Sequence, residues 1–393
     1  MKKLPVLALL FIAACSKKID QQASVQKLGE KQSCDFGMKS FNLTKRSLIQ
    51  NAGDELAKKK RPTSGGSGGG IISSPSSSAG VILLDFDGQL VSGTAWNTSG
   101  DFYCNPANLT SSEITTITQR VINDYSPFNV TVTTDESVYN AANIYRRIRV
   151  IITESWEWYG KQVGGATYLG SFTSGTSTPS FVFSSLLYYD PKYVAEAVSH
   201  EVGHSLGLHH QSLYDASCTK VSEYNYGQGT GEIGWAPIMG SSYSQNLTLW
   251  HNGQSSLGCT SYQDDLSVIA SIIGYRTDDY SNTTSGAAVL TSSADGIING
   301  SSDLDFFSVN ISTSKTVSLT PFNVGPYNAG ANTDLVLRVY DGQGGLISTI
   351  QDPNVLNAGT VLNPGSYFIS VGTTANIYAS VYGMLGRYNV SVY

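Results

Sequence analysis

The sequence of 393 residues has little charge, few cysteines and no long hydrophobic run. Charged residues make up 14% of it, against about 25% in an average soluble protein. Glycine and tyrosine are abundant instead, with 40 and 23 residues. This length is comfortable for two domains. The composition is typical of a loop-rich, β-containing exported protein and disfavours a helical cytosolic one.

The little charge that is present is unevenly distributed. Residues 1–62 contain 13 Lys and Arg against 5 Asp and Glu, so residues 63–393 contain 11 against 25. The main body therefore carries a formal charge of −14 within a chain whose net charge is −6. An acidic body repels a phosphate backbone, which disfavours nucleic acid as a partner.

No apolar run is long enough to span a bilayer, and Leu4–Ala14 follows two lysines at the N-terminus. This pattern predicts a signal peptide over residues 1–14. The run ends in Ile-Ala-Ala-Cys, which resembles the bacterial lipobox, where the signal is cleaved before a cysteine that is then lipidated. The resemblance implies a lipid anchor at Cys15 as the only membrane contact, and a place at the outer membrane or cell surface. The alternative is an ordinary signal cut near Ala14 and a secreted protein.

Four further cysteines are present at positions 34, 104, 218 and 259. Exported proteins meet oxidising conditions, so these cysteines are free to form disulfides, with three pairings open. Cys218 and Cys259 flank one loop-rich region, and we expect them to pair.

Residue patterns divide the chain into three parts after the signal. Residues 15–79 are polar, basic and then rich in Gly and Ser, which indicates an anchored pro-segment and a flexible linker. Over residues 80–280, strand patterns alternate with helical ones, including a helix over 111–125 with a Ser-x-x-Glu-type start. They predict an α/β sheet domain. Short alternating runs between turn residues over 285–393 predict a β-sandwich.

Four of the five histidines lie in HEVGHSLGLHH, residues 200–210. A helix start at Asp190-Pro191 and apolar residues at every fourth position predict a helix with one buried face. His200 and His204 lie 40° apart on the opposite face, which is the arrangement that two ligands of a tetrahedral zinc ion need. The fifth histidine, His251, is expected at the surface or in a loop.

Gly207 ends this helix and lets the chain turn back toward the two imidazoles. His209 and His210 then compete as a third ligand, because neighbouring side chains in an extended segment point to opposite sides. The residues alone leave that choice open. A purely structural zinc site is the alternative, although such sites usually close with four protein ligands.

The spacing His200-Glu201-x-x-His204-x-x-Gly207-x-x-His210 resembles the zinc signature of the metzincin metallopeptidases. The resemblance implies that His210 is the third ligand, that Glu201 is the general base and that His209 is a bystander. It also implies a twisted mixed sheet with an active-site helix as the fold of residues 80–280.

WAPIMGSSY, residues 235–243, resembles the metzincin Met-turn, in which a methionine lies beneath the metal without ligating it. Met239 is the match. Several branches place a tyrosine two residues after this methionine, but Ser241 holds that position here. The nearest tyrosine is Tyr243, and we expect no catalytic role for it. Stretches such as VILLDFDGQLVSGTAWN and QDDLSVIASIIGYRTDD further resemble a reprolysin-like bacterial branch.

These resemblances imply a zinc-dependent endopeptidase that acts on proteins or peptides. Zinc would lower the pKa of a bound water, and Glu201 would take its proton. GGATYLGSF, residues 164–172, would form an edge strand to which a substrate peptide adds. Two rival hypotheses are an enzyme acting on another amide and a cell-surface binding protein with a structural zinc site, whose sandwich does the binding.

The pro-segment contains two candidates for blocking the zinc. Some metzincins are kept latent by a pro-segment cysteine in the fourth zinc position, and a thiolate at Cys34 suits that role. Asp35 is the other candidate. A disulfide between Cys34 and Cys104 is the alternative use of this cysteine.

The C-terminal part resembles the pre-peptidase C-terminal type of domain found beside secreted bacterial peptidases. The resemblance rests on three stretches: GIINGSSDLDFFSVNI, DLVLRVYDGQGG and LNPGSYFISV. Asp303 and Asp305 are candidate Ca²⁺ ligands, although acidic turn residues usually face solvent.

Overall fold

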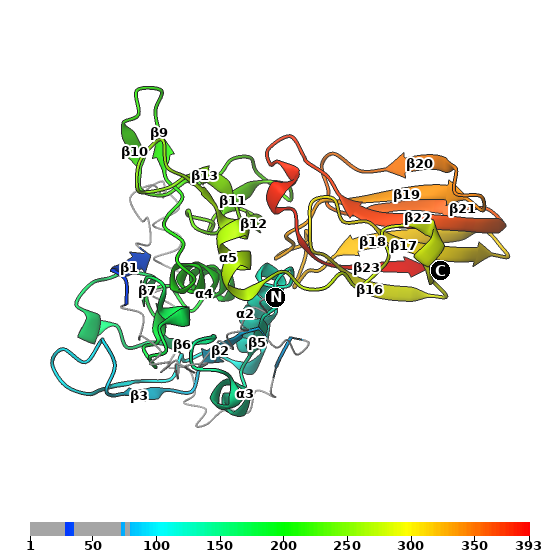
Figure 1. The fold of residues 1–393 in the computed structure, drawn as a ribbon. Helices are drawn as coiled ribbons and strands as arrows, with labels where there is room; N and C mark the ends of the chain where they lie inside the picture. The colour runs from blue at the N-terminus through cyan, green and yellow to red at the C-terminus, as the bar shows by residue number, and fades with distance from the viewer. Residues whose placement is uncertain (1–27, 35–71, 75–78) are drawn as a thin grey trace, which may run out of the picture.

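The computed structural model describes residues 28–34, 72–74 and 79–393. The signal peptide, Cys15, Asp35 and most of the predicted linker lie outside the described residues. The described chain is mostly β, with four α-helices, and forms two parts that lie side by side (Figure 1). Within the described ranges, no helix combines the length and the apolar character that crossing a membrane requires.

The first part is built on a six-stranded sheet with the order β1-β7-β8-β6-β2-β5. Its strands are β1 (Lys31–Cys34), β2 (Val81–Asp85), β5 (Thr131–Thr133), β6 (Arg147–Thr153), β7 (Gly165–Tyr168) and β8 (Ser180–Phe183). β2, β5, β6 and β8 are mutually parallel, whereas β7 is antiparallel to β8. The sheet is therefore mixed, with its antiparallel strands at one side.

β7 does not lie at the edge of this sheet, in contrast to the expectation from the sequence. β1 pairs with its outer side in antiparallel register, with Lys31 opposite Tyr168 and Cys34 opposite Gly165. The pairing continues before β1, where the Leu169 N–H donates to the carbonyl of Glu30 at 2.8 Å. A segment from the basic N-terminal region thus occupies the position that was expected to be open.

Four helices accompany the sheet. They are α2 (Ser111–Asp124), α3 (Glu136–Ala141), α4 (Pro191–Ser205) and α5 (Asp265–Ile273). α2 begins with a capping box formed by Thr110 and Glu113, so the capping residue is a threonine and not the expected serine. α4 begins as expected, with the Asp190 side chain accepting from the N–H groups of Lys192 and Tyr193. α4 packs against α2 on one side and against β7 and β8 on another.

Shorter elements build the loops of this part. The paired strands are β3 (Gln89–Val91) with β4 (Phe102–Cys104), β9 (Leu213–Tyr214) with β10 (Lys220–Ser222), β11 (Trp235–Pro237) with β12 (Leu247–Leu249), and β13 (Asn252–Gln254) with β14 (Tyr262–Asp264). The β9–β10 hairpin projects from the rest (Figure 1). Cys218 and Cys259, the expected pair, form a disulfide that fastens it. Cys104 is a buried free thiol, so it does not pair with Cys34.

The second part consists of two packed sheets. One has the order β15-β17-β22-β19-β20 and the other β16-β23-β18-β21. The strands are β15 (Ala288–Val289), β16 (Ser293–Ile298), β17 (Asp305–Ile311), β18 (Lys315–Pro321), β19 (Leu335–Asp341), β20 (Leu346–Ile350), β21 (Ala358–Leu362), β22 (Gly365–Thr373) and β23 (Gly386–Val392). β23 buries every second residue, as the alternating runs predicted, and the result is a β-sandwich.

The two parts share an interface that contains both apolar and polar contacts. Buried side chains from both, including Ile122 of α2 and Leu385 before β23, belong to one hydrophobic cluster. The Asn123 side chain donates to the carbonyl of Gly330 at 3.0 Å and accepts from the N–H of Arg387 at 3.0 Å. α2 also packs on α4, the helix that contains His200 and His204. The interface is therefore connected to these histidines through α2.

Candidate metal centre

α4 holds two of the three clustered histidines, and it is buried more completely than its sequence suggested. The apolar stripe was expected to face a core while the histidine face remained accessible. Instead, every residue from Val194 to Ser205 is buried, and His200 and His204 are 1% and 0% exposed. The contacts of the two histidines include the carbonyls of Ile238 and Leu208 and the ring of His210. The imidazoles therefore lie in a low-dielectric interior.

The turn after α4 brings the third histidine to the other two. Gly207 has a φ of +95°, a left-handed conformation that glycine adopts without strain. His210 then places its ring centroid 5.3 Å from that of His200 and 4.8 Å from that of His204. The chain path thus selects His210, and His209 lies outside the group. The backbone of His209 is held at both its N–H and its carbonyl by the Gln263 side chain.

Each clustered imidazole uses its Nδ1 within the protein. The Nδ1 of His200 is 2.8 Å from the carbonyl of Ile238, that of His204 is 2.6 Å from the carbonyl of Leu208, and that of His210 is 2.7 Å from Oε1 of Glu223. These contacts fix the rings and leave the three Nε2 atoms for a ligand. Within the described residues, none of these buried Nε2 atoms has a hydrogen-bond partner.

The electrostatic setting disfavours protonation of His200 and His204. Burial and the neighbouring His210 lower the pKa of His200 to about 3. Burial and the other two imidazoles lower the pKa of His204 as well. The ligand atoms of His200, His204 and His210 lie within 4.8 Å of one another, and the three residues could hold a metal ion. Imidazole nitrogens that converge without a hydrogen-bond partner suit Zn²⁺.

Glu201 is buried beside the cluster, under strand β7. A Cβ built on Gly165 would lie 2.6 Å from both Cγ and Oε1 of Glu201. Only a glycine can therefore occupy this position while the carboxylate keeps its place. The close approach places the Glu201 carboxylate directly against strand β7.

Met239 lies beneath α4, in the turn after β11. Its sulfur is so close to Gly203 that a Cβ on Gly203 would collide with it. The preceding carbonyl, of Ile238, accepts from His200. Met239 thus supports the helix between the first two histidines and does not belong to the group of nitrogen donors. Tyr243 packs edge-on against Tyr193 at the start of α4, with ring centroids 5.5 Å apart.

Sequence reasoning missed two residues of the site. Glu223 accepts from His210, and the hydrogen bond with His210 is the main cause that lowers the pKa of this carboxyl. Tyr224 places its ring centroid 4.6 Å from that of His210. Both lie in a loop after the β9–β10 hairpin, without a motif around them. His251 lies in a loop, which is one of the two places expected for it, and is half-buried against Trp235 with ring centroids 5.0 Å apart.

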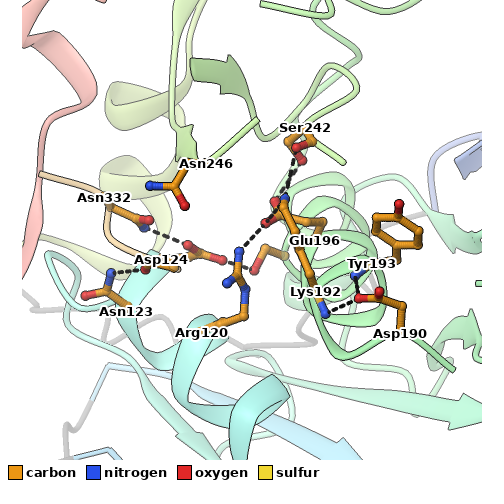
Figure 2. A network of polar contacts seen from close by, with 12 residues as sticks. Arg120, Asn123, Asp124, Asp190, Lys192, Tyr193, Glu196, Ser242, Asn246 and Asn332 are labelled. Atoms are coloured by element: carbon orange, nitrogen blue, oxygen red, sulfur yellow. Dashed lines mark hydrogen bonds and ion pairs between the residues drawn. The ribbon is translucent and has the colours of Figure 1, made fainter. Parts of the chain in front are cut away.

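A network of buried polar contacts links α2 and α4 (Figure 2). Arg120 of α2 donates to Glu196 of α4 at 2.9 Å, and Glu196 also accepts from Lys192 and Ser242. Burial raises the pKa of Glu196, but the charges of Lys192 and Arg120 outweigh it and lower the pKa overall. Ser242 belongs to the chain just after Met239. The network therefore ties α2, α4 and the Met239 turn together.

The same network reaches the β-sandwich through Asp124. This carboxylate accepts from Ser199, the residue before His200, and from Asn332 of the sandwich at 2.6 Å (Figure 2). The Trp250 indole donates to the Asp124 carbonyl at 2.8 Å. Burial and the nearby charge of Glu196 raise the pKa of Asp124 to about 7.

A second group of potential metal ligands lies where the two parts join. Oxygens of Asp278, Asp279 and Asp305 lie within 4.8 Å of one another. Asp305 is fully buried, and burial raises its pKa to about 8. Asp303, which the sequence paired with Asp305, is not in this group, and one of its oxygens accepts from the Asn299 N–H at 2.8 Å. The cluster therefore differs from the expected pair.

The sequence matches no protein-family model and no curated protein. Among solved structures, the pre-peptidase C-terminal domain of a collagenase from Bacillus anthracis is 16% identical, with a TM-score of 0.20. That match covers 30% of this chain and 98% of the domain. PliG of Aeromonas hydrophila, a periplasmic inhibitor of g-type lysozyme, is 17% identical, with a TM-score of 0.18 and coverages of 29% and 93%. Both likenesses are weak.

Proposed function

We propose that the protein is a zinc-dependent endopeptidase of the metzincin type. The observation that carries the proposal is the convergence of three buried, unpartnered imidazole Nε2 atoms beside the buried carboxylate of Glu201. Supporting it are the spacing of the signature, the position of Met239 under the helix, and a mixed sheet whose antiparallel strand lies over Glu201. A structural zinc site has no need of this carboxylate.

The residues present fit a catalytic zinc. His200, His204 and His210 would hold the ion through their Nε2 atoms and would add no negative charge to it. When bound, zinc supplies a Lewis acid that lowers the pKa of water toward about 7 and polarises a carbonyl. Glu201 then accepts the proton of the attacking water and passes it to the leaving amine. Glu223 orients His210, as the Ile238 and Leu208 carbonyls orient the other two rings.

A substrate is proposed to add to β7 as an extra strand, because main-chain pairing accepts many sequences. β1 supports this idea, since a segment of the chain already pairs with β7 along Gly165–Tyr168. Its backbone brings Cys34 opposite Gly165, above Glu201. The full chain is therefore proposed to be latent, and release of β1 to open the site. The role of the Cys34 thiol as a zinc ligand stays a prediction.

The proposal includes a location, which rests on the N-terminal signal, and a cofactor, which rests on the three histidines. The signal and Cys15 make the protein a lipid-anchored enzyme of a bacterial cell envelope, and one zinc ion is its cofactor. The rival function, a surface binding protein whose sandwich binds the partner, is disfavoured by the buried Glu201.

The metal assignment is testable with a matched pair of neighbouring histidines. We expect about one equivalent of zinc in the purified parent and in His209→Ala, and loss of most zinc in His210→Ala. Circular dichroism checks that both variants are folded. Zinc retained in a folded His210→Ala protein, or lost in His209→Ala, would contradict the assigned ligands.

A further inference from the structure

The strand β1 ends at the metal site and begins at an aromatic pair. Lys31 lies opposite Tyr168 in the register, three residues before Cys34, which lies opposite Gly165. The Lys31 ammonium nitrogen lies 5.1 Å from the ring centroid of Trp96 and 5.3 Å from that of Tyr168. These distances are typical of cation–π contacts.

The two rings are held in place by the rest of the protein. The Trp96 indole donates to the carbonyl of Pro179 at 2.8 Å, and the Tyr168 hydroxyl donates to the carbonyl of Ala95 at 3.0 Å. Trp96 also packs edge-on against Phe181, with ring centroids 5.3 Å apart. Trp96 is 4% exposed. The two rings are thus preorganised, so binding of a cation costs them little conformational entropy.

The two rings together form one binding site for a cation. Their centroids lie 4.6 Å apart with an angle of 58° between the planes, so both faces lie beside the same ammonium group. Lys31 itself is exposed, which shows that a side chain can enter this place from solvent. The acidic main body favours a positive side chain there over a negative one.

We propose that Trp96 and Tyr168 form a specificity subsite that selects a lysine or arginine side chain of the substrate. The proposal rests on the function proposed above and names its substrate class. A substrate strand that replaces β1 in the same direction places its basic residue three positions before the residue opposite Gly165. Lys31 occupies this subsite in the full chain, so the pro-segment is bound as a substrate would be.

The substrate preference can be read from the products of an unfolded protein. The full-length parent, after limited tryptic cleavage in the basic run of residues 58–61, is incubated with a reduced, alkylated protein, and the cleaved bonds are identified by mass spectrometry. We expect Lys and Arg to be enriched about three- to ten-fold at one position, the third or fourth residue before the cleaved bond. Cleavage without any such enrichment would overturn the subsite while leaving endopeptidase activity established.

A matched pair of variants assigns the preference to the ring. Tyr168→Phe keeps the aromatic face and loses only the hydroxyl, whereas Tyr168→Leu keeps an apolar side chain and loses the face. The measured quantity is the ratio of kcat/KM for two peptides that differ only in Lys or Met at the selected position. A variant that loses activity equally toward both peptides leaves this ratio unchanged. We expect the ratio to persist in Tyr168→Phe and to approach one in Tyr168→Leu; an unchanged ratio in Tyr168→Leu would contradict the proposal.

A second measurement is independent of proteolysis. In the full chain bearing Glu201→Gln, amide hydrogen exchange at residues 32–34 reports how firmly β1 is bound. Lys31→Met should speed this exchange about three- to ten-fold, and Lys31→Arg should leave it unchanged. Equal exchange in all three proteins would overturn the cation subsite, even if the protein proves to be a peptidase. Faster exchange in Lys31→Met alone would support the subsite, even if the protein proves not to be a peptidase.

Discussion

Gly165 lies directly against the carboxylate of Glu201, so closely that a Cβ at this glycine would be 2.6 Å from Oε1. The contact joins the strand to which a substrate is proposed to pair and the residue proposed to move the proton. Its closeness means that strand position and carboxylate position are not independent. Displacement of either one changes the other.

Gly165→Ala should therefore displace Glu201 while leaving the three histidines in place. We expect proteolysis to fall about 100-fold, because small misplacements of a catalytic group have large effects, with zinc content unchanged. Gly300→Ala is the matched control, since a Cβ there meets nothing within 4 Å. Full activity in Gly165→Ala would show that Glu201 does not need this position.

Removal of the Glu223 carboxylate tests the support of the third histidine. Glu223→Gln replaces the charged acceptor 2.7 Å from Nδ1 of His210 with a neutral amide. We expect zinc affinity to fall about 10- to 100-fold, which competition with a chelator measures. The exposed Asp352 offers a control substitution, Asp352→Asn. Unchanged affinity in Glu223→Gln would contradict the role given to this contact.

Asp124 should make stability depend on pH. Its pKa in the fold is raised to about 7, mainly by burial, so the folded protein retains a proton that the unfolded chain loses at lower pH. Its contribution to stability is thus lost as the pH rises from about 4 to about 7. We expect the stability of Asp124→Asn relative to the parent to improve by about 1 kcal/mol or more between about pH 5 and about pH 8. Denaturant unfolding at both values measures this, and a pH-independent difference would contradict it.

The disulfide between Cys218 and Cys259 should stabilise the loop that carries Glu223 and Tyr224. It closes a sequence separation of 41 residues. The double variant Cys218→Ser, Cys259→Ser should lose about 2–4 kcal/mol of unfolding free energy. Calorimetry of the oxidised parent, the reduced parent and the variant checks this. Equal stability of all three would show that the bond is dispensable.

Local signals in the sequence predicted much of the framework. Asp190 and Pro191 marked the start of α4 because capping is a local interaction, and alternation predicted strands such as β23 because the side-chain period is local too. Gly207 indicated the turn that brings His210 to the helix. The pairing of β1 with β7 had no such signal, because two strands separated by more than a hundred residues pair through their backbones.

Tertiary contacts also decided the features of the site that the sequence did not reveal. Glu223 and Tyr224 lie in a loop whose path depends on the disulfide and on neighbouring turns, so no spacing predicts their contact with His210. The complete burial of α4 has the same origin, since its histidines contact both the turn that follows the helix, at Leu208, and the more distant Ile238.

The most direct test of the proposed function compares the parent with Glu201→Gln. Bound zinc and cleavage of an unfolded protein are measured side by side, in the full chain and after limited tryptic cleavage at residues 58–61. One equivalent of zinc in both proteins, with cleavage at least about 100-fold faster in the parent, is the expected result. Equal cleavage by the two would contradict the role of Glu201. Zinc in both and cleavage in neither would contradict the endopeptidase and favour a binding protein.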